Sequence, residues 1–464
     1  MRMVFWYSDI ESREKYKDDE AEFRKFRHYD VSECGELLYI QRNFDICTIR
    51  VEFGIMIFVE GEDNGFAADK CYIFEQLKGD FIMFDLKNAA QRDKDFIDST
   101  WEKLDKKLSV VAVRSRDKIP YTTKKGSHIP HDGEGICWWT NGFWGGLMWL
   151  MYEGTKNDEY RLSAEKNEQL LDGAFKAFYG LHHDVGFMWH LTAGVNYKIT
   201  GNEESKIRNM YAASLLASRF NSVGNFIRAW NGELCVTIID SMMNIPLLYW
   251  ASKETGDPRF GHIAKKHADT VIENHIRPDG SVKHICVYNS ETGEYKEHLA
   301  GQGYGLDSSW SRGQAWALHG FVLSYIHTGE QRYLDVAKKV AHYFIASVCD
   351  DYLPKADFRS PEKPVLYDMT ASACAACGLL EIARNVPEYE GRIYYNAAIR
   401  LLKAMDEKFC NYSLDEDSVV GFGTERWTDN TEAIGTTANI PIIYGDYYFV
   451  EAIYKLKGFE LVFE

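Results

Sequence analysis

The sequence predicts an all-α fold, a closed barrel of antiparallel helical hairpins, preceded by a small β-rich segment. The first observation is a unit that recurs from about residue 93 onward: an apolar helix, a Thr-Gly or similar turn, and an amphipathic helix rich in Ala and Lys. The second is that these turns recur unevenly, roughly every 45–75 residues, whereas an open solenoid keeps a short and fixed period. Uneven spacing with long aromatic-rich inserts therefore favours a closed (α/α) barrel over an open superhelix.

Residues 1–92 are predicted to form a separate β-rich module, because runs rich in β-branched and aromatic residues are separated there by Gly. The expected strands cover residues 36–41, 46–53, 55–61 and 80–86. No cluster of metal ligands stands out in this module, and the sequence indicates no role for it. The predicted domains are therefore 1–92 and 93–464, with the barrel in the second.

The hairpin turns follow one another along the barrel region, at residues 149–160, 197–204, 248–260 and 322–341, with a looser copy at 379–391. The Gly of Thr-Gly ends one helix in the left-handed conformation, and Asp or Glu followed by Pro or Arg starts the antiparallel partner. In a closed ring these turns lie together at one end. We therefore expect the functional residues on the longer loops at the opposite end.

The composition excludes several classes of protein. The 464 residues carry a net charge of -16, which argues against nucleic acid or an anionic membrane as a partner, because both require a basic surface. The chain has no long uncharged apolar run, and its start lacks the apolar core of a signal peptide, so a cytoplasmic location is expected. The 12 Trp and 28 Tyr residues favour a carbohydrate cleft, where aromatic rings are common. The ten Cys are scattered, apart from Cys374 and Cys377 in a helical stretch, and are interpreted as buried reduced thiols.

The segment Asp307–Gly320 organises the candidate site. Its turn and cap residues lead into a helix, on which Arg312 and Trp316 are four residues apart and share one face. An Arg side chain supplies two parallel donors to a carboxylate, and a Trp ring packs on the apolar face of a sugar. The alternative is an Arg that caps a carbonyl and a Trp that lies in the core.

Asp184 and Asp240 are the candidate catalytic pair. Burial and a neighbouring carboxylate both raise the pKa of an Asp, so one of two such groups can hold a proton near neutral pH and act as a general acid. The alternative is that both residues cap helix N-termini. His182 and His183 suggest a metal site, but the sequence offers no defensible third and fourth ligand, so a hydrogen-bonding or structural role is favoured and no metal is predicted.

Five motifs, in order along the chain, resemble those of a known family. They are Trp139-Thr-Asn-Gly-Phe-Trp, His183-Asp-Val-Gly-Phe, Ile239-Asp-Ser-Met-Met-Asn-Ile-Pro-Leu-Leu-Tyr-Trp-Ala, Ser309-Trp-Ser-Arg-Gly-Gln-Ala-Trp-Ala-Leu and Ile443-Tyr-Gly-Asp-Tyr-Tyr-Phe. From about residue 93 to its end, the chain resembles the unsaturated glucuronyl hydrolases of glycoside hydrolase family 88. The resemblance implies an (α/α)₆ barrel that needs no cofactor. It also implies an enzyme that removes a Δ4,5-unsaturated uronic acid from the non-reducing end of lyase-generated, glycosaminoglycan-type oligosaccharides, by protonation and hydration of the C4=C5 enol ether.

Matched motif by motif, the resemblance implies that Asp240 is the general acid and base and that Asp184 is its assisting carboxylate. The residues implied to line the sugar subsite are Trp139, His284, Gln302, Arg312 and Trp316, with Arg312 as the partner of the uronate carboxylate. Some family members bind sulfated substrates through a loop near the C-terminus that carries Ser and Lys. The corresponding residues 428–433 read Thr-Asp-Asn-Thr-Glu-Ala, which puts a preference for sulfated chains in doubt.

Two alternatives stay open at this point. One is an unsaturated rhamnogalacturonyl hydrolase, which performs the same chemistry on pectin fragments, and the other is a non-catalytic sugar-binding regulator. A sugar 2-epimerase on a similar barrel would need a His-based acid and base pair. The expected partner is an unsaturated oligosaccharide, and the sequence does not predict an oligomeric state.

Overall fold

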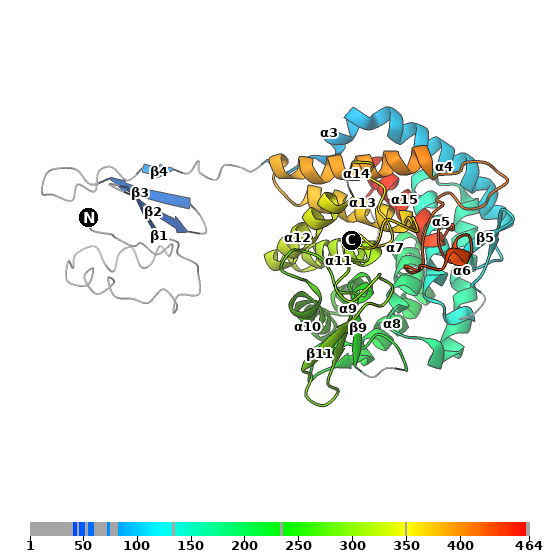
Figure 1. Cartoon of the computed structure of the whole chain (residues 1–464), viewed down its shortest axis with the longest axis horizontal. Coiled ribbons are helices and arrows are strands. Elements are labelled where there is room, and N and C mark those ends of the chain that lie inside the picture. Colours follow the sequence, from blue (N-terminus) through cyan, green and yellow to red (C-terminus); the bar gives the residue numbers. More distant parts are fainter. Residues whose placement is uncertain are drawn as a thin grey trace, which may run out of the picture. The chain divides into compact units, whose positions relative to one another are not determined.

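The computed structural model describes residues 82–131, 135–232, 235–348 and 350–460, together with four short strands between residues 40 and 74. The chain divides into two compact units, Met1–Ile82 and Met83–Glu464. In the first unit, strands β1 (Ile40–Asn43), β2 (Ile46–Val51), β3 (Gly54–Val59) and β4 (Tyr72–Phe74) pair in that order as an antiparallel sheet (Figure 1). The β-rich character expected for this segment is therefore present in the described strands.

The strand expected at residues 80–86 is wrong for the part that the structure describes. Met83 makes only an isolated bridge to Pro387, and helix α3 (Leu86–Ala90) begins three residues later. The Asp85 carboxylate accepts the Asn88 N–H at 3.0 Å, so this residue caps a helix instead of ending a strand. Residues 80 and 81 lie outside the described residues.

In the described residues from Met83 onward, six inner helical segments alternate with six outer helices (Figure 1). The inner segments are α5 (Phe143–Thr155), η8 with α7 (Gly186–Gly194 and Val195–Thr200), η9 with α9 (Ile239–Met243 and Pro246–Thr255), α11 (Ser311–Thr328), α13 (Met369–Arg384) and α15 (Ile443–Leu456). The outer helices are α4 (Lys94–Arg114), α6 (Asp158–Lys176), α8 (Glu203–Ser218), α10 (Pro258–His275), α12 (Gln331–Ser347) and α14 (Glu388–Lys408). Short pairs of strands, β5 with β6 (Thr122–Lys124 and Ser127–Ile129) and β7 with β8 (Phe220–Asn221 and Phe226–Ile227), lie in the connections.

The two sets of helices differ in how much of their surface is buried. In α11 every residue from Ser311 to Ser324 is buried, and in α13 every residue from Met369 to Ala383. Outer helix α12 buries only one stripe, which includes Tyr333, Ala337 and Phe344. A helix that is apolar all round belongs inside, and one with an apolar stripe covers it. The inner helices are therefore surrounded by a ring of amphipathic outer helices.

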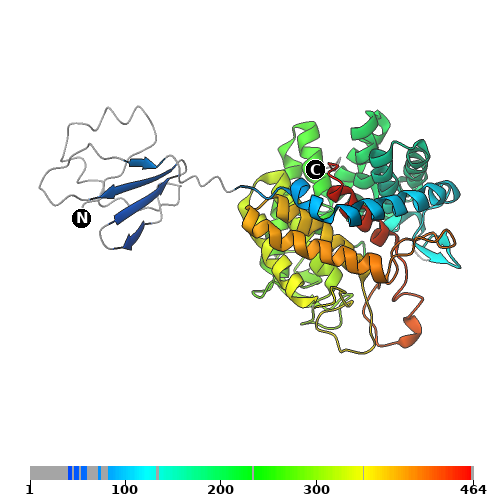
Figure 2. The ribbon, with the colours of Figure 1, turned by 90° about the horizontal axis from the view of Figure 1, so that it is seen from above.

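Neighbouring inner segments contact each other all the way round, and α15 returns to α5. The outer wall closes in the same way: α4 and α14 lie side by side (Figure 2), and Lys103 Nζ lies 2.8 Å from Asp406 Oδ1. The ring confirms the predicted (α/α)₆ barrel. No helix among the described residues is both apolar and long enough to cross a membrane.

In four of the turns between inner and outer helices, a Thr side chain makes the same pair of hydrogen bonds. The hydroxyl of Thr200 donates to the carbonyl four residues earlier at 2.8 Å and accepts the N–H two residues later at 3.2 Å. Thr155, Thr255 and Thr328 make the same two bonds. The residue after Thr has positive φ, at 73°, 70° and 69° for Gly201, Gly256 and Gly329. Because each of these four turns follows the C-terminus of an inner helix, all four turns lie at the same end of the barrel.

A small antiparallel sheet lies among the loops of the opposite end. Its strand order is β11 (Tyr295–Leu299), β10 (Ile285–Tyr288) and β9 (Val236–Ile238). Ile285 pairs with Ile238, and the Ile239 N–H donates to the His284 carbonyl at 3.1 Å. The sheet therefore holds Ile239, which follows β9, beside His284, which precedes β10.

Candidate active site

The candidate residues gather where the inner helices begin, at the end opposite the threonine turns. Trp139 opens η6 (Trp139–Gly142) before α5, Asp184 precedes η8, Asp240 lies in η9, and Arg312 lies in the first turn of α11. This arrangement is the one expected for loops that feed inner helices. It places side chains from widely separated segments at one end of the barrel.

Asn244 joins the two candidate catalytic residues. Its amide nitrogen donates to Asp184 Oδ1 at 2.9 Å and lies 3.3 Å from the Asp240 main-chain carbonyl oxygen. Its amide oxygen accepts the Phe187 N–H at 2.9 Å, which fixes the orientation of the amide. Asp184 and Asp240 are 6% and 7% exposed, so both are nearly buried but still reachable from the loops. Asn244 therefore links the Asp184 carboxylate to the backbone of Asp240.

The Asp184 carboxylate is surrounded by donors and imidazoles. Oδ2 lies 3.2 Å from His183 Nε2 and 3.3 Å from His182 Nδ1, and Oδ1 accepts from Asn244. Burial by itself would raise the pKa of Asp184, but the neighbouring imidazoles of His183 and His182 outweigh it and hold the pKa well below its ordinary value. Asp184 therefore carries a negative charge at neutral pH.

Asp240 faces His284, and the backbone sets the tautomer of that imidazole. The Gln302 N–H donates to His284 Nδ1 at 2.9 Å. Because Nδ1 must accept this bond, a neutral His284 carries its proton on Nε2. Nε2 lies 3.5 Å from Asp240 Oδ2, an oxygen that has no hydrogen-bond partner among the described residues. His284 thus presents an N–H toward an oxygen of Asp240 that is free to act on a substrate.

The Arg312 side chain is engaged within the protein. It is 1% exposed, pairs through Nη1 with Asp368, and donates to the Thr424 and Glu425 carbonyls at 2.7 and 2.8 Å. Both terminal nitrogens are therefore used, as in the alternative in which Arg caps carbonyls. While these bonds persist, the side chain cannot offer two parallel donors to a uronate, so its place in substrate binding stays a prediction.

The aromatic residues form one cluster around the mouth of the inner ring. The Trp139 ring is half-buried and lies 4.9 Å from the Tyr444 ring and 5.4 Å from the Phe187 ring, measured between centroids. Trp316 is completely buried behind it, with its ring centroid 6.5 Å from that of Trp139. Trp139 is therefore partly exposed at this end of the barrel, whereas Trp316 lies in the core, as in the second alternative for that residue.

The other carboxylates in the predicted loops serve the fold. Asp368 pairs with Arg312, and Asp446 accepts the Val419 and Val420 N–H groups at 2.9 and 2.6 Å. Gln302 likewise spans loops, since its side chain donates to the Glu425 carbonyl. Asn244 is not among the candidate residues expected from the sequence. Its position four residues after Asp240, one helical turn away, was the signal that could have identified it.

The sequence of this chain matches a known family of enzymes. The model of Glycosyl Hydrolase Family 88 matches residues 111–354. The chain belongs to glycoside hydrolase family 88. It is 33% identical over 353 residues to the unsaturated glucuronyl hydrolase of Bacillus sp. (strain GL1), a match that covers 72% of this chain and 92% of the relative. It is also 33% identical over 326 residues to the unsaturated chondroitin disaccharide hydrolase of Streptococcus pneumoniae (strain ATCC BAA-255 / R6), which covers 68% of this chain and 81% of that protein.

The solved structure of the Bacillus sp. GL1 unsaturated glucuronyl hydrolase has the same architecture as this family 88 member. The two structures align with a TM-score of 0.72 at 30% identity, over 77% of this chain and 97% of the other. Membership of family 88 makes the chain a glycoside hydrolase and confirms the resemblance drawn from the five motifs. The first four motifs, with Asp184, Asp240 and Arg312, lie within the matched residues 111–354.

Proposed function

We propose that this family 88 hydrolase removes a Δ4,5-unsaturated uronic acid from the non-reducing end of glycosaminoglycan-type oligosaccharides. The observation that carries the proposal is the arrangement around Asn244, which joins an ionised Asp184 to Asp240 within one nearly buried site. The names of the relatives, unsaturated glucuronyl hydrolase and unsaturated chondroitin disaccharide hydrolase, support this class of substrate.

The reaction that this site suits begins at an enol ether. In the unsaturated uronate, the C4=C5 bond is attached to the ring oxygen, so protonation of C4 develops positive charge at C5 that the ring oxygen shares. Water then adds at C5, the resulting hemiketal opens, and the remaining sugar leaves. One carboxylic acid must donate the first proton and afterwards accept one from the water. A second carboxylate, already ionised, stabilises the positive charge as it develops.

We assign the first role to Asp240 and the second to Asp184. Asp240 Oδ2 makes no hydrogen bond within the described protein and is therefore available to a substrate atom, with the His284 N–H beside it. Asp184 has two imidazoles and one amide around its carboxylate, which favour the charged form. The half-buried ring of Trp139 is the platform on which the sugar would pack.

A panel of unsaturated disaccharides tests the proposal. Purified protein is incubated with unsaturated chondroitin, hyaluronan and rhamnogalacturonan disaccharides, and loss of the alkene's ultraviolet absorbance is followed. We expect turnover of the first two and little of the third. Preferred turnover of the rhamnogalacturonan disaccharide would assign the pectin activity instead, and binding without turnover would assign a non-catalytic sugar-binding role.

Sulfated chondroitin disaccharides added to the panel test the preference for sulfated chains, which the sequence puts in doubt. Asp429 and Glu432, in the segment where some relatives carry Ser and Lys, are exposed carboxylates. A sulfate group placed near them would be repelled, because like charges raise each other's energy. We therefore expect the unsulfated chondroitin disaccharide to have a higher kcat/KM than its sulfated forms.

A further inference from the structure

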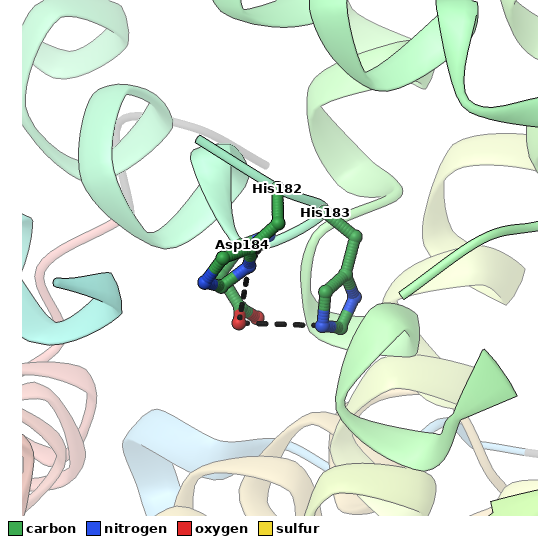
Figure 3. Close-up of side chains that lie close together, drawn as sticks. All are labelled: His182, His183 and Asp184. Atoms are coloured by element: carbon green, nitrogen blue, oxygen red, sulfur yellow. Dashed lines mark hydrogen bonds and ion pairs between the residues drawn. The ribbon is translucent and has the colours of Figure 1, made fainter. Parts of the chain in front are cut away.

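Three consecutive residues, His182, His183 and Asp184, present one carboxylate oxygen and two imidazole nitrogens to each other. In Figure 3 the Asp184 carboxylate lies between the two rings, with Oδ2 3.3 Å from His182 Nδ1 and 3.2 Å from His183 Nε2. All three ligand atoms lie within 4.8 Å of one another. The sequence alone offered no defensible third ligand for the two histidines, and the structure supplies one in Asp184.

These separations match the shell of a transition-metal ion. Zinc bonds to His nitrogen and carboxylate oxygen are about 2.0–2.2 Å long, so neighbouring ligand atoms in a tetrahedral shell lie roughly 3.3–3.5 Å apart. The two nitrogen–oxygen distances are already close to that spacing, and the partly exposed His182 can swing its nitrogen toward that of His183. We propose that His182, His183 and Asp184 bind a divalent transition-metal ion of the Zn²⁺ type, with the fourth position open to water.

The surroundings favour a cation at this point. His183 is completely buried, and apart from the 3.2 Å contact of Nε2 with Asp184 its ring nitrogens have no hydrogen-bond partner among the described residues. Coordination through Nε2 would give this buried nitrogen a well-directed partner. Asn244 holds the other oxygen of Asp184 at 2.9 Å, which orients the carboxylate as an outer-shell partner does in metal sites. Among the described residues, the Asp184 N–H lies 3.5 Å from His182 Nδ1, a distance too long for a strong bond that would compete with a metal ion.

The ion would act as an inhibitor, not as a cofactor. Coordination neutralises the charge of Asp184, the carboxylate that the proposed mechanism needs in its ionised form, and places a positive charge beside C5 where positive charge must develop. This consequence rests on the proposed function, whereas the metal site itself does not. Binding and turnover are therefore measured separately.

Cobalt spectroscopy on the full-length protein tests the site directly. The metal-free protein is titrated with Co²⁺, the visible absorption of the bound ion is recorded, and Zn²⁺ is added to displace it. We expect one Co²⁺ per chain whose spectrum is abolished by Zn²⁺. His182→Gln removes a ligand and should weaken binding by at least about 10-fold, because disturbing even an outer-shell partner typically costs about 10–100-fold. The matched control is His262→Gln, which alters an exposed His on α10 and should leave binding unchanged.

Two results would overturn the metal site: no saturable Co²⁺ or Zn²⁺ binding, or equal affinity in wild type and His182→Gln. Turnover of the unsaturated disaccharide is then followed with increasing Zn²⁺ and after adding EDTA. Inhibition reversed by EDTA, at a higher Zn²⁺ concentration in His182→Gln, supports the site. Metal binding that leaves turnover unchanged would keep the site and count against the role proposed for Asp184.

Discussion

Asp240 is the residue on which the proposed chemistry most depends, because it both donates and recovers the proton. Asp240→Asn keeps the size of the side chain and removes its acidity. Since general acid–base catalysis contributes about 10²–10⁴-fold and this group serves two steps, we expect kcat to fall by at least roughly 10³-fold. Turnover is measured by the ultraviolet absorbance of the alkene, and circular dichroism checks that the fold survives. A near-normal rate in a folded variant would show that another group supplies the proton.

Lys156 adopts a backbone conformation that is unfavourable for a residue with a side chain. It occupies the left-handed position after Thr155, with φ of 60°, whereas the equivalent turns have Gly. A non-Gly residue in this region costs about 1 kcal/mol or more. We therefore expect Lys156→Gly to stabilise the protein by up to about 1 kcal/mol, less the entropy that Gly adds to the unfolded chain.

The stability of Lys156→Gly is measured by urea unfolding followed by circular dichroism. The reverse change, Gly256→Lys in the equivalent turn at φ of 70°, serves as the matched control and should destabilise. Turnover should not change in either variant, because these turns lie at the end of the barrel away from Asp240. A destabilised Lys156→Gly would mean that the contact of Lys156 with Glu153 outweighs the strain.

At the scale of elements, Arg312 ties the start of α11 to the start of α13 and to the loop at residues 424–425. Its partner Asp368 is also completely buried. Removing one member of a buried pair leaves the other charged without compensation, which typically costs about 3–5 kcal/mol. We therefore expect Arg312→Met to be destabilised by about that amount, and the double variant with Asp368→Asn to lose less than the sum of the two single changes.

Urea unfolding of the two single variants and the double variant measures this coupling. Arg161, in a solvent-exposed pair with Asp158, provides the matched control, and Arg161→Met should cost less than about 1 kcal/mol. Strict additivity of Arg312→Met and Asp368→Asn would show that the two groups do not depend on each other.

Asp446 makes stability depend on pH through the contact between α15 and the loop at residues 418–420. Burial raises its pKa to about 6, although the Val420 and Val419 N–H groups and nearby Lys107 act in the opposite direction. Because the folded state binds the proton more tightly than the unfolded chain, this contribution is full below about pH 4 and is lost as pH rises through about 6, a change of roughly 3 kcal/mol.

Asp446→Asn cannot titrate and is therefore the reference for this effect. We expect the stability of the wild type, relative to this variant, to fall as pH is raised from about 4 to 7. Urea midpoints of both proteins at several pH values give the difference. Parallel pH profiles for the two proteins would contradict the raised pKa of Asp446.

At the scale of the whole molecule, features that depend on hydrogen bonds between nearby residues could be predicted from the sequence. Features that depend on contacts between distant residues could not. The barrel was predictable because the threonine turn is built from residues at most six apart, as at Thr200. The engagement of Arg312 was not, because Asp368 and Thr424 lie 56 and 112 positions further along the chain. Trp316 was ambiguous for the same reason: only packing by segments from other hairpins decides whether its ring is exposed.

The start of the helical unit is a further case in which packing overrides a local pattern. Residues 83–92, which the sequence analysis placed with the β-rich module, pack in this structure against the barrel. Phe84 and Leu86 are buried, the Phe84 ring lies 5.7 Å from that of Tyr395, and the Phe84 N–H donates to the Val386 carbonyl at 3.1 Å. Two truncations distinguish the boundary at residue 93 from one at Met83.

A chain that begins at Met83 contains every residue assigned to the site. We expect its kcat/KM on the unsaturated disaccharide to stay within about threefold of the full-length value, a change of roughly 0.65 kcal/mol in activation free energy.

A chain that begins at residue 93 also keeps the site but loses Phe84 and Leu86, whose burial contributes about 1.5–3 kcal/mol each. It should therefore unfold at a clearly lower urea concentration than the Met83 chain. If the two truncated proteins are equally stable, the contact of residues 83–92 with α14 contributes nothing, and the barrel begins where the sequence analysis placed it. If the Met83 chain instead loses turnover while remaining folded, the β-rich module contributes to catalysis.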